Sequence, residues 1–91
     1  MSTPRWRQCD DVAARRLDDE VVLVNLKTNH IYSLNETGSR LWELLDPPRT
    51  RDEVVDALFG EFEVERLALE RETDELLHSL EEASLVVADG D

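Results

Sequence analysis

The chain has 91 residues, of which 41% are hydrophobic and 35% are charged. This length suits one domain with a single core, and this balance is typical of a globular rather than a disordered protein. The formal net charge of −12 opposes binding to nucleic-acid phosphates and favours a basic or neutral peptide as partner, although acidic residues also keep a small domain soluble.

Neither a membrane span nor a secretion signal is evident in the sequence. No apolar run approaches the roughly 20 residues of a membrane-spanning helix, and the polar stretch after Met1 contains no apolar signal core. The single cysteine, Cys9, has no partner for an intramolecular disulfide, which suits a reducing compartment. We therefore expect a cytoplasmic protein.

One domain is expected over residues 12–87, because neither an internal repeat nor a linker interrupts this stretch. Residues 1–11 show no hydrophobic periodicity, and we expect them to form a flexible N-terminal arm that carries one large apolar side chain, Trp6. Residues 88–91 are interpreted as a small polar tail.

A β-hairpin is predicted over residues 20–34. Val21–Leu26 is a β-branched apolar run bounded by charge, and Ile31–Leu34 is the returning strand. The tight turn between them contains Asn29, which tolerates a positive φ. A preceding strand near Ala13–Leu17 would complete a three-stranded antiparallel sheet, and helices must cover one face because a lone hairpin is marginally stable.

Three helices are predicted after the hairpin. Asn35 is the expected N-cap of the first, which ends before Pro47-Pro48 because proline removes a hydrogen-bond donor and forces the preceding residue into an extended conformation. A capping box over Thr50–Glu53 begins the second, and Gly60 is expected to end it. The inward-facing residues of this second helix are predicted to be Val54, Val55, Leu58 and Phe59.

The third helix is predicted from about Val64 to Ala83. Its apolar positions recur at helical spacing and comprise Leu69, Thr73, Leu76, Leu77 and Leu80. Leu85–Val87 is expected to close the core or to add a short strand. Strands followed by helices within one domain predict an α+β fold.

The sequence contains no recognisable catalytic or metal-binding motif. His30 and His78 are far apart on different elements, and Cys9 lies in the arm without a base or an orienting partner. The acidic pairs Asp10-Asp11 and Asp18-Asp19 lack the spacing of a calcium-binding loop. We therefore expect neither an enzyme nor a cofactor.

A small sheet beside an amphipathic helix generally leaves one strand edge open. Such an edge binds an extended peptide by strand addition, in which main-chain hydrogen bonds set the register and apolar pockets give selectivity. If Ile31–Leu34 is this edge, the third helix forms the other wall of a groove. The sequence alone leaves this open, because many small sheets cover their edges.

The stretch Val21–Leu45 resembles the PqqD-like family, whose members recognise precursors of ribosomally synthesised and post-translationally modified peptides. The match is carried by Leu34-Asn35-Glu36-Thr37-Gly38 together with Trp42. The later pattern also fits, with Arg49-Thr50 before a helix, Phe59 and Phe62 near its end, and an acidic third helix that runs into Leu85-Val86. The resemblance covers about residues 12–87.

This resemblance implies a winged-helix-turn-helix-like fold of three antiparallel strands and three helices. It also implies that the leader segment of a precursor peptide docks as an added strand and is presented to a maturation enzyme. That enzyme is a leader protease in lasso-peptide biosynthesis or a radical enzyme in quinone-cofactor biosynthesis, and the pattern and length are somewhat more similar to the lasso type.

The resemblance further implies which residues contact the leader. The binding strand comprises His30, Ile31, Tyr32, Ser33 and Leu34, and the groove-facing helix positions are Leu69, Glu70, Thr73, Asp74, Leu76 and Leu77. Glu70 and Asp74 are expected to pair with basic leader residues. Asn35, Gly38 and Trp42 are interpreted as structural: a helix cap, a close approach and a core residue.

Three other interpretations of the sequence are possible. The second and third helices resemble the paired helices of a winged-helix DNA-binding protein, but the third carries only two arginines among many acids. The open edge would alternatively serve dimerisation or another protein contact. A small enzyme is the third alternative. Salt-sensitive DNA binding would support the first, and self-association without peptide affinity the second.

Overall fold

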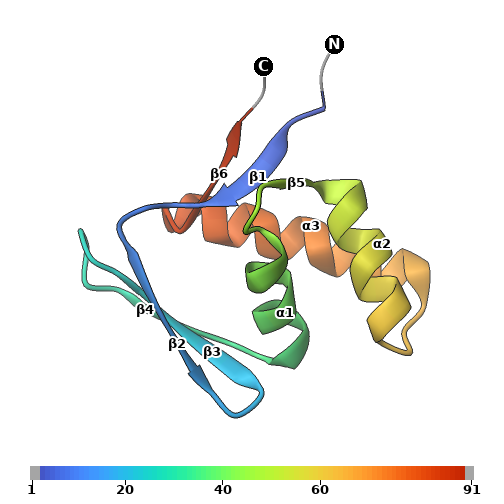
Figure 1. Cartoon of the computed structure of the whole chain (residues 1–91), viewed down its shortest axis with the longest axis horizontal. Coiled ribbons are helices and arrows are strands. Elements are labelled where there is room, and N and C mark those ends of the chain that lie inside the picture. The colour runs from blue at the N-terminus through green and yellow to red at the C-terminus, as the bar shows by residue number, and fades with distance from the viewer. Residues whose placement is uncertain (1–2, 90–91) are drawn as a thin grey trace.

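The computed structural model describes residues 3–89, which form an α+β fold of two three-stranded sheets and three helices (Figure 1). The sheet formed within residues 12–34 and the three helices follow one another along the chain in the predicted order. The elements are β1 (Arg5–Gln8), β2 (Val12–Leu17), β3 (Glu20–Asn25), β4 (Ile31–Leu34), α1 (Glu36–Leu44), β5 (Arg49–Thr50), α2 (Arg51–Glu61), α3 (Arg66–Glu82) and β6 (Val86–Asp89).

The predicted antiparallel sheet is present in the order β2-β3-β4. Val22 lies opposite Ser33 and Leu23 opposite Tyr32, and Asn29 in the connecting turn has the expected positive φ of 65°. Val21 and Leu23 are buried, because alternate residues of a strand point to the same face and this face packs against the helices. β3 is central, so β2 and β4 are the two edge strands.

A second sheet, in the order β5-β1-β6, was not predicted. Residues 5–8 form a paired strand rather than a loose arm, and Trp6 packs against the core opposite Ala88. Residues 88–89 are likewise part of β6 rather than a tail. Such short strands have no informative periodicity, and their partners lie more than 40 residues away. The remaining arm and tail residues 1–2 and 90–91 lie outside the described residues.

The predicted starts of the first two helices are confirmed, whereas α3 begins at Arg66, two residues after the predicted Val64. The Asn35 side chain accepts a hydrogen bond from the Gly38 N–H at 2.8 Å. Thr50 and Glu53 form a reciprocal capping box at α2, in which the hydrogen bond from the Thr50 N–H lowers the pKa of Glu53. The end of α2 differs from the prediction, since the helix continues through Gly60 to Glu61.

One hydrophobic core joins the β2-β3-β4 sheet to the three helices. The expected inward residues Val54, Val55 and Leu58 are fully buried, whereas Phe59 is 43% exposed and was wrongly placed inside. The buried core also includes Leu23, Leu34, Leu41, Trp42, Leu45, Leu69, Leu77, Leu80, Leu85 and Val86. Among residues 3–89, no helix has the length and hydropathy needed to cross a bilayer.

Gly38 is the predicted point of close approach between α1 and α3. A Cβ at this position would lie 3.3 Å from Cδ2 of Leu76 and 3.2 Å from Oδ1 of Asn35. A side chain at residue 38 would therefore crowd both the N-cap and α3, and glycine keeps the start of α1 close to the middle of α3.

Candidate functional site

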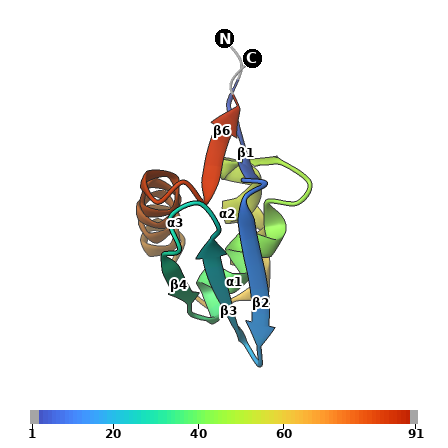
Figure 2. The ribbon, with the colours of Figure 1, turned by 90° about the vertical axis from the view of Figure 1, so that its left-hand side faces the viewer.

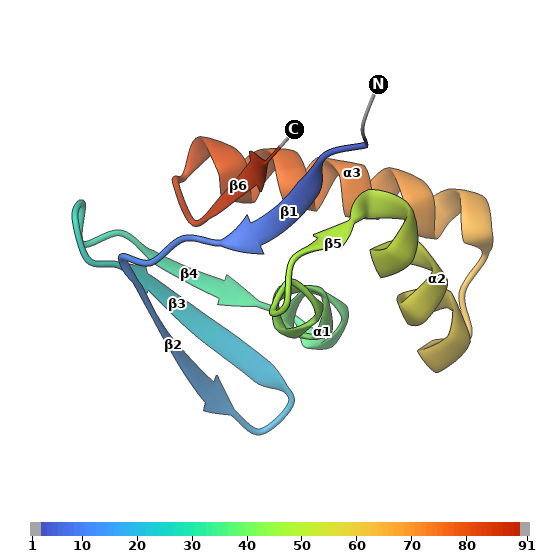
Figure 3. The same cartoon turned by 45° about the horizontal axis from the view of Figure 1, so that its top comes forward.

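β4 presents an open edge on the side of the sheet that faces α3 (Figures 2 and 3). In an antiparallel pair, the N–H and C=O groups of successive residues point alternately toward the partner strand and away from it. The Asn25 N–H donates to the His30 carbonyl at 2.9 Å, so His30, Tyr32 and Leu34 direct their backbone groups toward β3. The backbone groups of Ile31 and Ser33 consequently point outward.

The Ser39 side chain completes the hydrogen bonding between β3 and β4 at the end of β4. The Val21 N–H donates to Ser39 Oγ at 2.7 Å, and Ser39 Oγ donates in turn to the Leu34 carbonyl at 3.1 Å. The hydroxyl is buried and thus bridges the last position of the β3–β4 pair. This bridge joins the end of β4 to α1, and it does not involve the outward-pointing backbone N–H and C=O groups of Ser33.

A groove of about 580 Å³ lies beside this edge, between the β4–α1 junction and α3. Its floor is apolar and includes Leu34, Leu41, Leu58, Leu69 and Leu76. Polar residues surround this floor, among them Ser33 on β4 and Glu72, Glu75 and Ser79 on α3. An apolar floor next to unpaired main-chain groups is the arrangement that strand addition requires.

Five of the residues predicted to bind peptide line this groove, namely Ser33, Leu34, Leu69, Thr73 and Leu76. Ile31 is 67% exposed and lies on the open edge, and Tyr32 packs partly against the core. His30 is exposed beside the turn, where its carbonyl accepts a hydrogen bond from the Asn25 N–H of β3.

Leu77 was predicted to face the groove, but it is 2% exposed, lies outside the groove lining and is part of the core.

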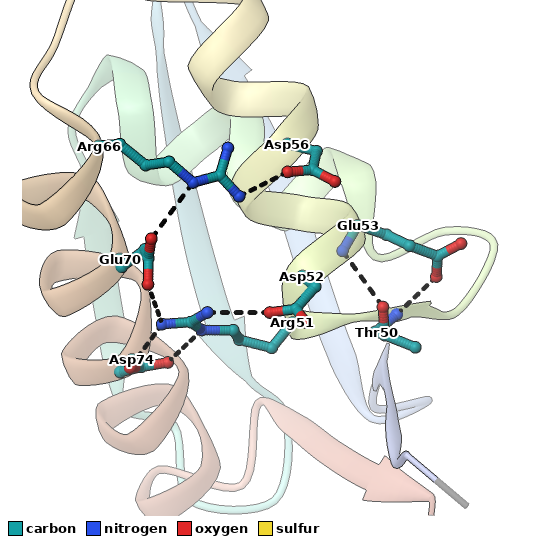
Figure 4. A network of polar contacts seen from close by, with 8 residues as sticks. All are labelled: Thr50, Arg51, Asp52, Glu53, Asp56, Arg66, Glu70 and Asp74. Carbon is teal, nitrogen blue, oxygen red and sulfur yellow. Dashed lines mark hydrogen bonds and ion pairs between the residues drawn. The ribbon is translucent and has the colours of Figure 1, made fainter.

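Glu70 and Asp74 were expected to face the peptide, but they face α2 instead (Figure 4). Arg51 Nε lies 2.8 Å from Asp74 Oδ1, and its Nη2 lies 3.3 Å from Glu70 Oε1. Arg66 also contacts Glu70, at 3.2 Å. The hydrogen bond to Asp74 is the main cause of the raised pKa of Arg51, followed by that to Asp52. These two acids join α3 to α2 and are absent from the groove lining.

The groove also contains acidic residues that sequence reasoning missed. Glu72, Glu75 and Ser79 are spaced by three and four positions, so they form one row along α3 beside the floor residues Leu69 and Leu76. The helical spacing of these residues could have identified them in the sequence, because polar residues that flank the apolar stripe of a helix lie at the edge of any groove over that stripe. The β4–α1 junction also contributes Asn35, Thr37 and Gly38 to the groove lining, although none of these three was predicted to contact the leader.

Cys9 lies away from the groove, beside a second and smaller hollow near Leu45 and Pro48. Partial burial raises the pKa of its thiol, which lowers its reactivity as a nucleophile. Within residues 3–89, no three histidine, cysteine or acidic side chains are grouped to hold a metal ion.

The family of the chain follows from comparison with known proteins. Residues 20–86 match the family model described as coenzyme PQQ synthesis protein D, PqqD. The chain belongs to the PqqD family. The matched segment begins with β3 and ends within β6, so it contains the open edge, the groove and all three helices. Among curated proteins, none matched this PqqD-family chain.

Two solved structures resemble this PqqD-family chain over nearly its whole length. One is TbiB1 in complex with the TbiA(beta) leader peptide, with 35% identity, a TM-score of 0.83, and coverage of 93% of this chain and 99% of the other. The second is a lasso peptide synthetase B1 complexed with its leader peptide, with 28% identity, a TM-score of 0.76, and coverage of 90% and 96%. The resemblance to the lasso type of PqqD-like protein is thereby confirmed.

Proposed function

We propose that this protein binds the leader segment of a ribosomally made precursor peptide by adding it as a strand to the open edge of β4, and presents it to a maturation enzyme. The observation that carries this proposal is the pair of outward-facing backbone positions, Ile31 and Ser33, next to an apolar-floored groove. The leader strand forms main-chain hydrogen bonds with these two residues. Its alternate side chains enter the groove.

The proposed partner enzyme belongs to lasso-peptide biosynthesis. Both similar structures hold a leader peptide, and one is a lasso peptide synthetase B1. In this proposal the protein performs no chemistry, takes no cofactor and works in the cytoplasm, where the single Cys9 stays reduced. A leader protease acts on the peptide while the leader is held, and a radical enzyme of quinone-cofactor biosynthesis is the alternative partner.

The sharpest test removes one outward N–H from the edge. Proline is tolerated in an edge strand where its missing N–H would have faced solvent, so Ser33→Pro is expected to fold. The same change deletes a main-chain donor to the leader, and we expect the dissociation constant for the TbiA(beta) leader peptide to rise at least about tenfold by calorimetry. Ser33→Ala is the matched control, because it keeps the N–H and should retain the affinity.

Two results would contradict the proposal. One is a native Ser33→Pro protein that binds the leader as tightly as Ser33→Ala. The other is the absence of wild-type binding both to the TbiA(beta) leader and to a leader encoded beside the gene of this chain. Dimerisation through the same edge is the competing function, and light scattering would then detect a dimer that Ser33→Pro disrupts.

A further inference from the structure

The β2-β3-β4 sheet packs one face on the helices and turns its other face away from them. In Figure 2 the three strands lie in front of the helices. Within β3, Val21, Leu23 and Asn25 are buried, but the two valines between them are partly exposed. Alternate residues of a strand point to opposite faces, so Val22 and Val24 lie on the second face, which we call the outer face. With the residues that pair across the strands, its apolar members are Ala13, Leu17, Val22, Val24 and Ile31.

Contacts on the opposite face confirm this orientation for the two edge strands. Arg16 of β2 forms an ion pair with Glu43 of α1, so its side chain lies on the helix side of the sheet. Tyr32 of β4 packs against the core. Their neighbours Arg15 and Ile31 therefore point to the outer face.

The outer face is more apolar than a solvated sheet face normally is. An antiparallel sheet with one wet face has strands that alternate between apolar and polar residues, whereas a continuous apolar run is typical of a strand covered on both faces. β3 contains such a run, Val21–Val24. At the two edges of the face, Leu17 is 51% exposed and Ile31 is 67% exposed. Apolar residues grouped over three strands indicate an interaction surface, because scattered single ones would be ordinary.

The charge of the outer face indicates what kind of surface would cover it. Arg15 lies opposite Val22, is exposed, and forms no ion pair among residues 3–89. Glu20 is at the rim, where β3 begins after the turn from β2. An apolar surface with a carboxylate opposite Arg15 would complement this arrangement. A second copy of the chain is a poor candidate, because two molecules of net charge −12 repel each other.

We propose that the outer face docks the maturation enzyme, through an apolar patch of the enzyme that carries a carboxylate opposite Arg15. This inference rests on the proposed function and names the surface by which the partner enzyme is held. Ile31 belongs both to the outer face and to the open edge of β4, so the two surfaces are continuous. An enzyme seated on the outer face is therefore next to the leader strand.

The test measures how tightly the enzyme binds to variants of the outer face. The probe is the leader protease encoded beside the gene of this chain, and the full chain is first loaded with the leader peptide that binds in calorimetry. Arg15→Glu should raise the dissociation constant for the protease at least about tenfold, because it places like charges opposite each other. The double variant Val22→Thr/Val24→Thr keeps the side-chain shape and the strand propensity. It should raise this constant about three- to tenfold, because hydroxyl groups would be buried.

Arg71→Glu is the matched control for charge. It makes the same change in net charge at an exposed position of α3 that is outside the groove lining and forms no ion pair within the described part of the chain. We expect it to bind the protease like the wild type. All three variants should keep the wild-type affinity for the leader, since none of them changes the open edge or the groove. Circular dichroism establishes that each is folded.

The outcomes distinguish this inference from the proposed function. If the leader binds but Arg15→Glu and the double valine variant bind the protease as tightly as Arg71→Glu, the docking surface is overturned while leader binding stands. Failure of the protease to bind the loaded wild type would likewise overturn it. So would a wild-type dimer in light scattering that the double valine variant disrupts, because a second copy would then cover the face. If no leader peptide binds at all, the proposed function itself fails.

Discussion

The two faces of α3 use the same residue types for different purposes. On the face toward α2, Glu70 and Asp74 are paired with Arg51, which fixes the second helix against the third (Figure 4). On the face toward the groove, Glu72 and Glu75 are unpaired among the described residues and border an apolar floor. Two positions along a helix correspond to a rotation of roughly 200°, so residues this close in sequence face nearly opposite directions.

The difference shows that acidic composition alone does not identify a ligand-binding surface. On the face toward α2, Glu70 and Asp74 form ion pairs with Arg51 of the same molecule. On the face toward the groove, the acids have no such partner among the described residues. Individual ion pairs of this kind are weak, with about 0.2–1 kcal/mol each when exposed to solvent. Under the proposed function, the affinity for a leader would therefore come mainly from strand hydrogen bonds and the apolar floor rather than from ion pairs.

The largest expected effect separates the core from the groove on the same helix. Leu77→Ala removes a side chain that is 2% exposed in the core, and it should lower the free energy of unfolding by about 2–5 kcal/mol. Leu76→Ala is the same chemical change at a half-buried groove residue. It should destabilise less and weaken leader binding more. Denaturant melts and calorimetry measure both, and equal effects on stability and affinity would show that this division of α3 is wrong.

A smaller effect is expected from breaking the α2 face. Arg51→Met removes the guanidinium that bridges Asp74, Glu70 and Asp52 while keeping a long apolar stem. We expect the free energy of unfolding to fall by about 1 kcal/mol, with a smaller difference from wild type at high salt. Leader affinity should remain unchanged in calorimetry. A loss of affinity equal to that of Leu76→Ala would mean that this face contributes to binding.

The smallest expected effect is a gain in stability. Glu72→Gln keeps the shape of the side chain and removes the like-charge repulsion with Glu75, so the free energy of unfolding should rise by about 0.2–0.5 kcal/mol. Thermal melts at low ionic strength are the suitable measurement. The control is Glu70→Gln, which loses contacts with Arg51 and Arg66 and should destabilise instead. Destabilisation by both variants would contradict the contrast between the two faces.

Local sequence signals predicted much of this fold. The hairpin and its turn at Asn29, the N-caps Asn35 and Thr50, and the stop at Pro47-Pro48 depend on residues within a few positions of each other. The position of β4, the strand proposed to bind the leader, was predicted for the same reason. The second sheet was missed because β1, β5 and β6 are short and pair only across the full length of the chain.

The site was predicted less completely than the fold. Hydrophobic periodicity identified Leu69, Thr73 and Leu76 on α3, but it also placed Leu77, a core residue, in the groove. Periodicity defines an apolar stripe without showing which part of the stripe meets the sheet and which part meets a ligand. That the chosen strand has a free edge on its α3 side was not evident from the sequence either.

The sequence by itself determined the order of the helices, the N-caps of α1 and α2, the hairpin with its turn at Asn29, and the acidity of α3, because these depend on local backbone preferences and on composition. Only the tertiary structure decided which acids remain available to a ligand. Arg51 lies about 20 residues from Glu70 and Asp74 in the chain, and the packing of α2 on α3 brings its guanidinium to those two carboxylates. The same packing turns Glu72 and Glu75 toward the open edge of β4.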